Sequence, residues 1–140
     1  SRGWVRARGG SRTLRAVGRP ADGTVDALAR EGFAELAAGR PFEAHERFED
    51  AWRLARGARA EAPLKGLAQL AAALVKAERG EPTGHAKLWR KSRARLRAEA
   101  RGALAGIDLA RLGAGLPEAP APLTEVLARI DAARVDQRPR

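Results

Sequence analysis

Apolar residues recur every three or four positions along most of the chain, and this spacing predicts amphipathic helices. The first helix is expected to begin near Thr24, and Gly39 followed by Pro41 marks its end and the start of the next. Thr83 is expected to be the N-cap of a later helix. Beyond the first, we expect helices over residues 41–55, 63–80, 83–101 and 123–135.

The connections between the first four helices are short, which is typical of antiparallel neighbours in a bundle. Residues 102–122 are rich in Gly and Pro, so we expect them to be mostly irregular, with a turn of helix over 107–112. No segment shows a convincing strand pattern. The sequence therefore predicts an all-α, single-domain antiparallel bundle of about five helices over residues 23–140, because 140 residues suit one hydrophobic core.

Apolar positions in residues 1–22 follow neither the period of two of a strand nor the period of 3.6 of a helix. We therefore expect these residues to form a disordered Arg/Gly-rich arm. The net charge of the chain is +10, and residues 1–19 contribute six arginines and no acid to it. Most of the positive excess therefore belongs to the arm. The composition alone gives only weak support for a nucleic-acid partner.

The composition also excludes several classes of protein. The chain has no cysteine, so it has neither disulfides nor thiolate metal sites, and it suits a reducing cytoplasm. Its longest run without a charge is residues 66–75, about half of the roughly 20 residues that a membrane-spanning helix needs. We therefore expect a cytoplasmic protein without a membrane span.

The helix over 41–55 places ionisable groups among aromatic ones. At about 100° per residue, His45 and Glu49 lie on the arc that the helix should bury, one turn apart. The members of that arc are Phe42, Ala44, His45, Phe48, Glu49, Ala51 and Trp52. The opposite side, with Glu43, Arg47 and Asp50, is expected to face water.

The helix over 63–80 is apolar almost all round, which is typical of a central helix. Its Lys65, Gln69 and Lys76 share one narrow side, and antiparallel packing on that side would bring Gln69 and Lys76 to Glu46 or Glu49. We therefore predict one polar cluster beside Trp52. Its members are His45, Glu46, Glu49, Gln69 and Lys76.

Two motifs carry a family resemblance. They are Phe42-Glu43-Ala44-His45-Glu46-x-x-Glu49-x-x-Trp52-Arg53 and Leu64-x-Gly66-Leu67-x-Gln69-Leu70-Ala71-Ala72-Ala73-x-x-Lys76, followed by Gly80 and Gly84. Over about residues 24–101 the chain resembles the small bacterial proteins grouped as domain of unknown function family 309. The resemblance implies an all-helical, cytosolic bundle, and it implies no reaction.

Three functions fit these residues. The first is a non-catalytic binding or scaffold domain, in which the predicted cluster either fixes the packing or lines a pocket for a small polar ligand, and which is compatible with a homo-oligomer.

The second function is a metal-assisted or acid/base enzyme that uses His45 and Glu49. A zinc-protease helix would have a second histidine where this chain has Glu49, and His85 is the only other one, so we assign no catalytic residue, metal or cofactor.

The third function is nucleic-acid binding through the basic helix over 83–101, together with the arm. The candidate residues are Lys87, Arg90, Lys91 and Arg97. Basic residues appear on all sides of that helix, between the core positions Leu88 and Leu96, which is also typical of an ordinary solvated helix. We therefore expect no nucleic-acid partner, and we expect Trp89 to pack in the core.

Overall fold

The computed structural model describes residues 22–135 of the chain. The predicted arm lies outside these residues apart from Asp22, where the first helix begins. The expectation of a mainly helical protein is confirmed. The helices are α1 (Asp22–Ala37), α2 (Pro41–Leu54), α3 (Glu61–Glu78), α4 (Pro82–Glu99), α5 (Leu109–Gly115) and α6 (Leu123–Ala132), and the strands are β1 (Ala103–Leu104) and β2 (Ile107–Asp108).

Proline sets the start of two of these helices. Pro41 begins α2 as predicted, and Pro82 begins α4 one residue before the expected N-cap, so the prediction for Thr83 is wrong. A proline at the first helical position has no N–H that would need a partner. The N-cap of α4 is Glu81, whose side chain caps no backbone N–H and instead accepts a hydrogen bond from Nζ of Lys76 at 3.0 Å.

The prediction that residues 102–122 are mostly irregular is wrong for residues 103–115, although the turn of helix expected over 107–112 overlaps α5. Strands β1 and β2 pair in an antiparallel hairpin, with Leu104 opposite Ile107, and α5 follows directly. Ala105 and Gly106 between the strands have φ of +55° and +77°, as a tight hairpin turn requires. Asp26 of α1 supports this turn, because its Oδ1 accepts the N–H of Ala105 at 2.7 Å.

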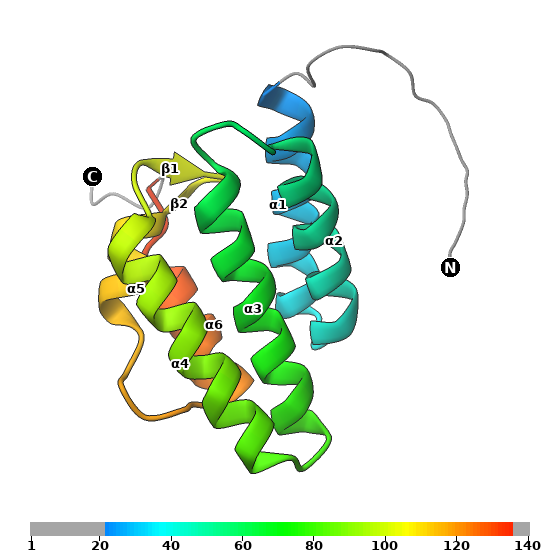
Figure 1. Cartoon of the computed structure of the whole chain (residues 1–140), viewed down its shortest axis with the longest axis vertical. Helices are drawn as coiled ribbons and strands as arrows, with labels where there is room; N and C mark the ends of the chain where they lie inside the picture. Colours follow the sequence, from blue (N-terminus) through cyan, green and yellow to red (C-terminus); the bar gives the residue numbers. More distant parts are fainter. Residues whose placement is uncertain (1–21, 136–140) are drawn as a thin grey trace.

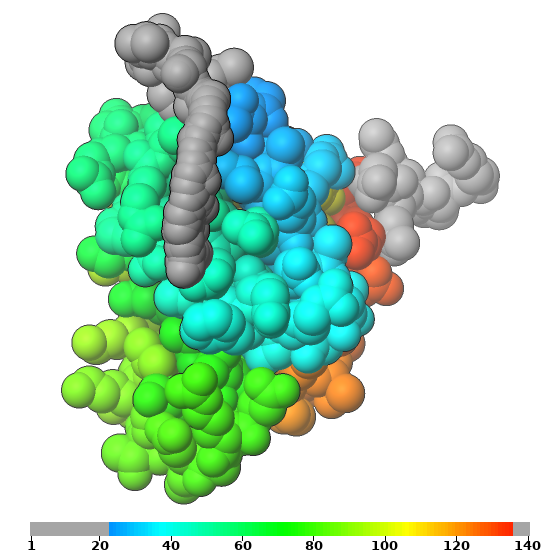
Figure 2. Space-filling view, turned by 90° about the vertical axis from the view of Figure 1, so that its right-hand side faces the viewer, coloured from blue at the N-terminus to red at the C-terminus, as the bar shows by residue number. Residues whose placement is uncertain are grey.

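The helices form two layers. Figure 1 shows α3 between α2 and α4, with α1 and α6 behind them. The view turned by 90° shows α1 (blue) beside α2 (cyan to green), and α6 (orange to red) on the same side as α1 (Figure 2). The core between the layers takes residues from all six helices, including Phe33, Phe48, Leu67, Trp89, Leu112 and Val126. Within the described part of the chain, no helix is long and apolar enough to cross a membrane.

Close backbone contact between α4 and α5 depends on Gly113. A Cβ atom at this position would lie 2.9 Å from the carbonyl carbon and oxygen of Leu96, closer than such atoms can approach without a shift of the backbone. Gly115, two residues later, is different, because an added Cβ would meet only Cδ of Arg129, at 3.8 Å. Helix α5 thus contains one glycine that has no room for a side chain and one that has room for a methyl group.

We predict that Gly113→Ala lowers the free energy of unfolding by about 1–3 kcal/mol, since α5 must move away from α4. Gly115→Ala is the matched control and should be neutral or slightly stabilising, because alanine costs less backbone entropy in a helix. Urea denaturation followed by circular dichroism measures both variants. Equal stabilities of the two variants would contradict this account of the packing of α4 and α5.

Candidate functional site

The buried arc of α2 is largely where its phase predicts. Phe48 is fully buried, and Trp52, His45 and Glu49 are half-buried beside it. Phe42 is an exception, because 48% of it is exposed. It lies about 120° around the helix from Phe48, at the edge of the arc. The packed face is therefore narrower at the first turn of α2 than the sequence predicts.

His45 and Glu49 do lie one turn apart on α2, with Nε2 of His45 3.9 Å from Oε2 of Glu49. This distance is too long for a hydrogen bond. Oε1 of Glu49 accepts instead from Nη2 of Arg53 at 3.3 Å. All three side chains retain contact with solvent, with exposed fractions of 28% for His45, 33% for Glu49 and 57% for Arg53. They form a half-exposed row along one helix.

The polar residues of α3 make their contacts elsewhere. Oε1 of Gln69 accepts from Nε of Arg95 in α4 at 3.3 Å, and Lys76 donates to Glu81 at the start of α4. Among residues 22–135, the structure shows no hydrogen bond or ion pair for Glu46. The six predicted site residues therefore share the outer side of α2 and α3, but the structure does not join them in one hydrogen-bonded network.

The indole nitrogen of Trp52 is the feature of this surface that the sequence did not reveal. This nitrogen, Nε1, is buried, and no atom of the described residues accepts a hydrogen bond from it. Every other buried side-chain nitrogen or oxygen of the described residues has a hydrogen-bond partner. The ammonium group of Lys65 in α3 lies 5.4 Å from the centre of the indole ring, within the range of a cation–π interaction. An unpaired buried donor costs about 1–3 kcal/mol, so Trp52 calls for an explanation.

The other histidine and tryptophan of residues 22–135, His85 and Trp89, pack against each other. Nε1 of Trp89 donates to the carbonyl oxygen of Pro117 at 2.9 Å, and Trp89 is only 1% exposed, so the prediction that it packs in the core is confirmed. The rings of His85 and Trp89 form a T-shaped pair with centroids 6.0 Å apart, and Nε2 of His85 lies 3.1 Å from the carbonyl oxygen of Ala121. Across residues 22–135, no three histidine, aspartate or glutamate side chains are placed to hold a metal ion, so His45 and Glu49 have no third ligand there.

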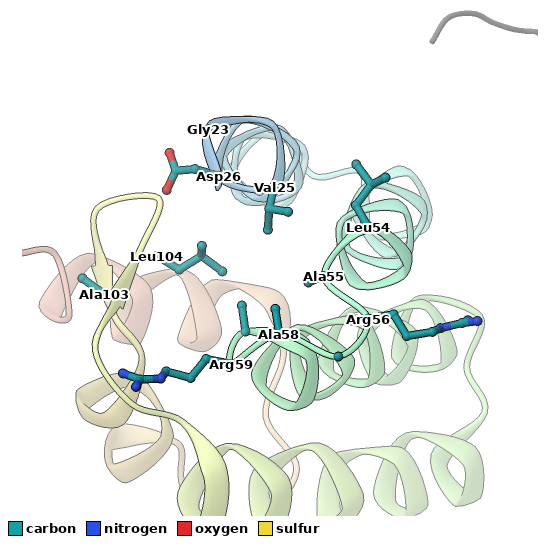
Figure 3. Close-up of a pocket in the computed structure, with 12 residues that line it drawn as sticks. Gly23, Val25, Asp26, Leu54, Ala55, Arg56, Ala58, Arg59, Ala103 and Leu104 are labelled. Atoms are coloured by element: carbon teal, nitrogen blue, oxygen red, sulfur yellow. The ribbon is translucent and has the colours of Figure 1, made fainter. Parts of the chain in front are cut away.

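A cleft of about 690 Å³ opens at the end of the molecule where α1 begins, and sequence reasoning missed it. The start of α1, the connection from α2 to α3 and the β-hairpin surround it. In Figure 3, Val25, Ala58 and Leu104 face this space, whereas Asp26 and Arg59 point away from it. Asp26 is already engaged with Arg30 and with Ala105. The side chains that face the cleft are thus apolar, and the charged side chains of Asp26 and Arg59 are directed away from it.

The nucleic-acid candidates occupy a third surface. Lys87, Arg90, Lys91 and Arg97 are all exposed. They lie on the side of α4 that faces away from α3 and from the core, since the buried residues of α4 are Trp89, Ser92 and Leu96. The structure therefore brings these four cations together on one face, apart from Trp52 and from the cleft.

Comparison with known proteins gives one match. The family model described as "Domain of unknown function (DUF309)" matches residues 29–88. No curated protein and no solved structure matches the chain. The matched range contains α2 and α3 completely, and with them His45, Glu49, Trp52, Lys65 and Gln69.

The indole N–H groups of Trp52 and Trp89 permit a matched test. We predict that Trp89→Phe lowers the free energy of unfolding by about 2–4 kcal/mol, because it removes a hydrogen bond and leaves a cavity. Trp52→Phe removes a donor that has no acceptor in the described part of the chain, which offsets part of the lost burial, so its cost should be about 1 kcal/mol or less. Thermal and urea denaturation measure both. A cost for Trp52→Phe as large as that for Trp89→Phe would show that the Trp52 indole N–H is paired.

Proposed function

We propose that this chain, whose residues 29–88 match the DUF309 family model, is a non-catalytic binding domain that holds a small ligand beside Trp52, on the outer side of α2 and α3. The ligand group that fits is a carboxylate or a phosphate. Its oxygen would accept from Nε1 of Trp52 and would lie near the ammonium group of Lys65. The observation that carries the proposal is this buried indole donor beside a cation.

The burial of the indole nitrogen is compatible with access by a ligand. The Lys65 side chain is half-buried and lies over the Trp52 ring, and a lysine has a flexible four-carbon chain that can move at small cost. Movement of Lys65 would open a path to the ring while keeping its charge close to an incoming anion. A charge-assisted hydrogen bond formed there is stronger than a neutral one.

The surrounding charges support an anionic ligand. Of the cations on this outer side, Arg53 pairs with Glu49 and Asp50, and Arg95 lies 3.9 Å from Glu99. Lys65 has no acidic partner among residues 22–135, so its charge is available to an anion. The ion pair between Arg53 and Glu49 is half-exposed, and such pairs contribute about 0–1 kcal/mol to folding. Folding stability therefore depends little on this ion pair, which leaves its two residues available for binding. The lack of cysteine supports a cytoplasmic location for this function.

Nuclear magnetic resonance of the indole N–H groups tests the proposal. In ¹⁵N-labelled protein, the Trp52 signal is identified by its absence from Trp52→Phe, and the protein is titrated with sodium phosphate and with citrate. We expect this signal to shift with saturation for at least one of the two anions. Lys65→Gln should weaken the apparent affinity about tenfold, because a charged hydrogen bond of about 1.5 kcal/mol is lost.

Lys87→Gln is the control, since it removes the same charge from the exposed face of α4 and should leave the Trp52 titration unchanged. The proposal is wrong if the Trp52 signal responds to neither anion. It is also wrong if Lys65→Gln and Lys87→Gln weaken the response equally, because the effect would then come from the net charge of the chain.

A further inference from the structure

The outward face of α4 carries a line of cations that is independent of the Trp52 surface. At 100° per residue, Lys87, Arg90, Lys91 and Arg97 fall within an arc of about 120° around the helix axis. They span about 15 Å along it, at 1.5 Å per residue. The other positions on this arc are Thr83, Ala94 and Ala98, so it contains neither an acid nor a large apolar residue.

The remaining arginines of α4 are directed toward neighbouring elements. Nε of Arg93 donates to the carbonyl oxygen of Leu116 at 3.0 Å, and Nε of Arg95 donates to Gln69. The basic residues that the sequence places on all sides of the helix are therefore of two kinds. Arg93 and Arg95 hold α4 to the rest of the fold. Arg97, on the outward arc, also donates from Nη1 to the carbonyl oxygen of Ala114 in α5 at 3.3 Å. None of the four residues on that arc has an acidic partner among residues 22–135.

Helix α4 also accounts for the positive charge of the described chain. It contains six basic residues and one acid, Glu99, which lies 3.9 Å from Arg95. The rest of residues 22–135 contains 13 basic and 15 acidic residues. A net excess of cations is thus confined to one helix, and its exposed part lies on one face. Such a one-sided distribution is typical of a surface that binds a polyanion.

The form of the polyanion follows from what this face lacks. Proteins that hold single strands stack bases on exposed aromatic rings, and the only aromatic residue of α4 besides His85 is Trp89, which is buried. A helix that lies on a membrane presents large apolar residues to the lipid, and the outward arc has none. A duplex requires neither feature, because its backbone presents one negative charge per about 1.7 Å of axis.

We infer that the outward face of α4 binds the phosphate backbone of a nucleic-acid duplex, without reading its sequence. Lys87, Arg90, Lys91 and Arg97 would each contact a phosphate, and the small side chains of Ala94 and Ala98 would let the backbone approach the helix. DNA and RNA duplexes share this chemistry. The six arginines of residues 1–19 lie outside the described residues and can add contacts of their own, so the test must separate them from α4.

Fluorescence anisotropy of the full chain with labelled 20-base-pair DNA and RNA duplexes provides the test, over a series of salt concentrations. We compare Arg90→Gln/Arg97→Gln with the control Arg56→Gln/Arg79→Gln, which removes two exposed arginines outside α4. The plot of log affinity against log salt should become less steep by about 2 for the α4 variant. Its affinity should fall by roughly tenfold to a hundredfold near 0.1 M salt, whereas the control should stay within about twofold of the unchanged chain.

The affinities of the unchanged chain for the two duplexes identify DNA or RNA as the better partner. A loss of affinity for either duplex in the α4 variant but not in the control supports the inference. Equal losses in the α4 variant and the control overturn it, because attraction would then follow net charge or the arm. Failure of the unchanged chain to bind either duplex, or tighter binding to a single strand or to anionic lipid vesicles, overturns it as well. Circular dichroism confirms that both variants are folded.

Discussion

The packing of α3 between α2 and α4 is the constraint on which the rest of the structure depends. Ten of its residues are buried, and several of them are glycine or alanine, so both neighbours can approach its backbone closely. At Gly66 an added Cβ would already lie 3.1 Å from the Leu96 side chain of α4. With most of its circumference covered, α3 can keep polar groups only along one outer edge. Lys65, Gln69 and Lys76 occupy that edge.

This constraint separates stability from surface chemistry. The core supplies the stability through apolar contacts, and the polar side chains of the outer edge are half-exposed and paired with different neighbours. Trp52 belongs both to the core and to the outer edge. Its ring packs against the core, while its Nε1 has no acceptor in the described part of the chain. The outward arc of α4 belongs neither to the core nor to the outer edge of α3, since its four cations are exposed. Two surfaces with different chemistry thus lie on one helical framework.

Local sequence signals predicted the helices well, because their period and their prolines act within a few residues. The hairpin escaped prediction because its strands have two residues each, too few to show alternation, and its turn is Ala105-Gly106 instead of the usual Asn-Gly or Asp-Gly. Side-chain partners were harder to predict. Gln69 meets Arg95 of α4, 26 residues away, and this pairing depends on how α3 and α4 are rotated against each other.

The same limit applies to the candidate site. The sequence placed Trp52, His45 and Glu49 on the packed side of α2, and the structure shows them half-buried at the border of that side. The absence of an acceptor for the Trp52 indole nitrogen depends on every neighbour in three dimensions, so the sequence could not show it. Likewise, the sequence showed that α4 is basic, and only the burial of Trp89, Ser92 and Leu96 shows which of its cations share a face.

A crystal structure at a resolution that shows ordered water tests the central claim most directly, because it reveals what lies next to Nε1 of Trp52. We predict a water or an anion oxygen about 3 Å from this nitrogen, reached beside the Lys65 side chain. A carbonyl or side-chain oxygen of the protein itself in that position would contradict the account. The indole would then be an ordinary structural donor, and the outer side of α2 and α3 would have no unpaired group for a ligand.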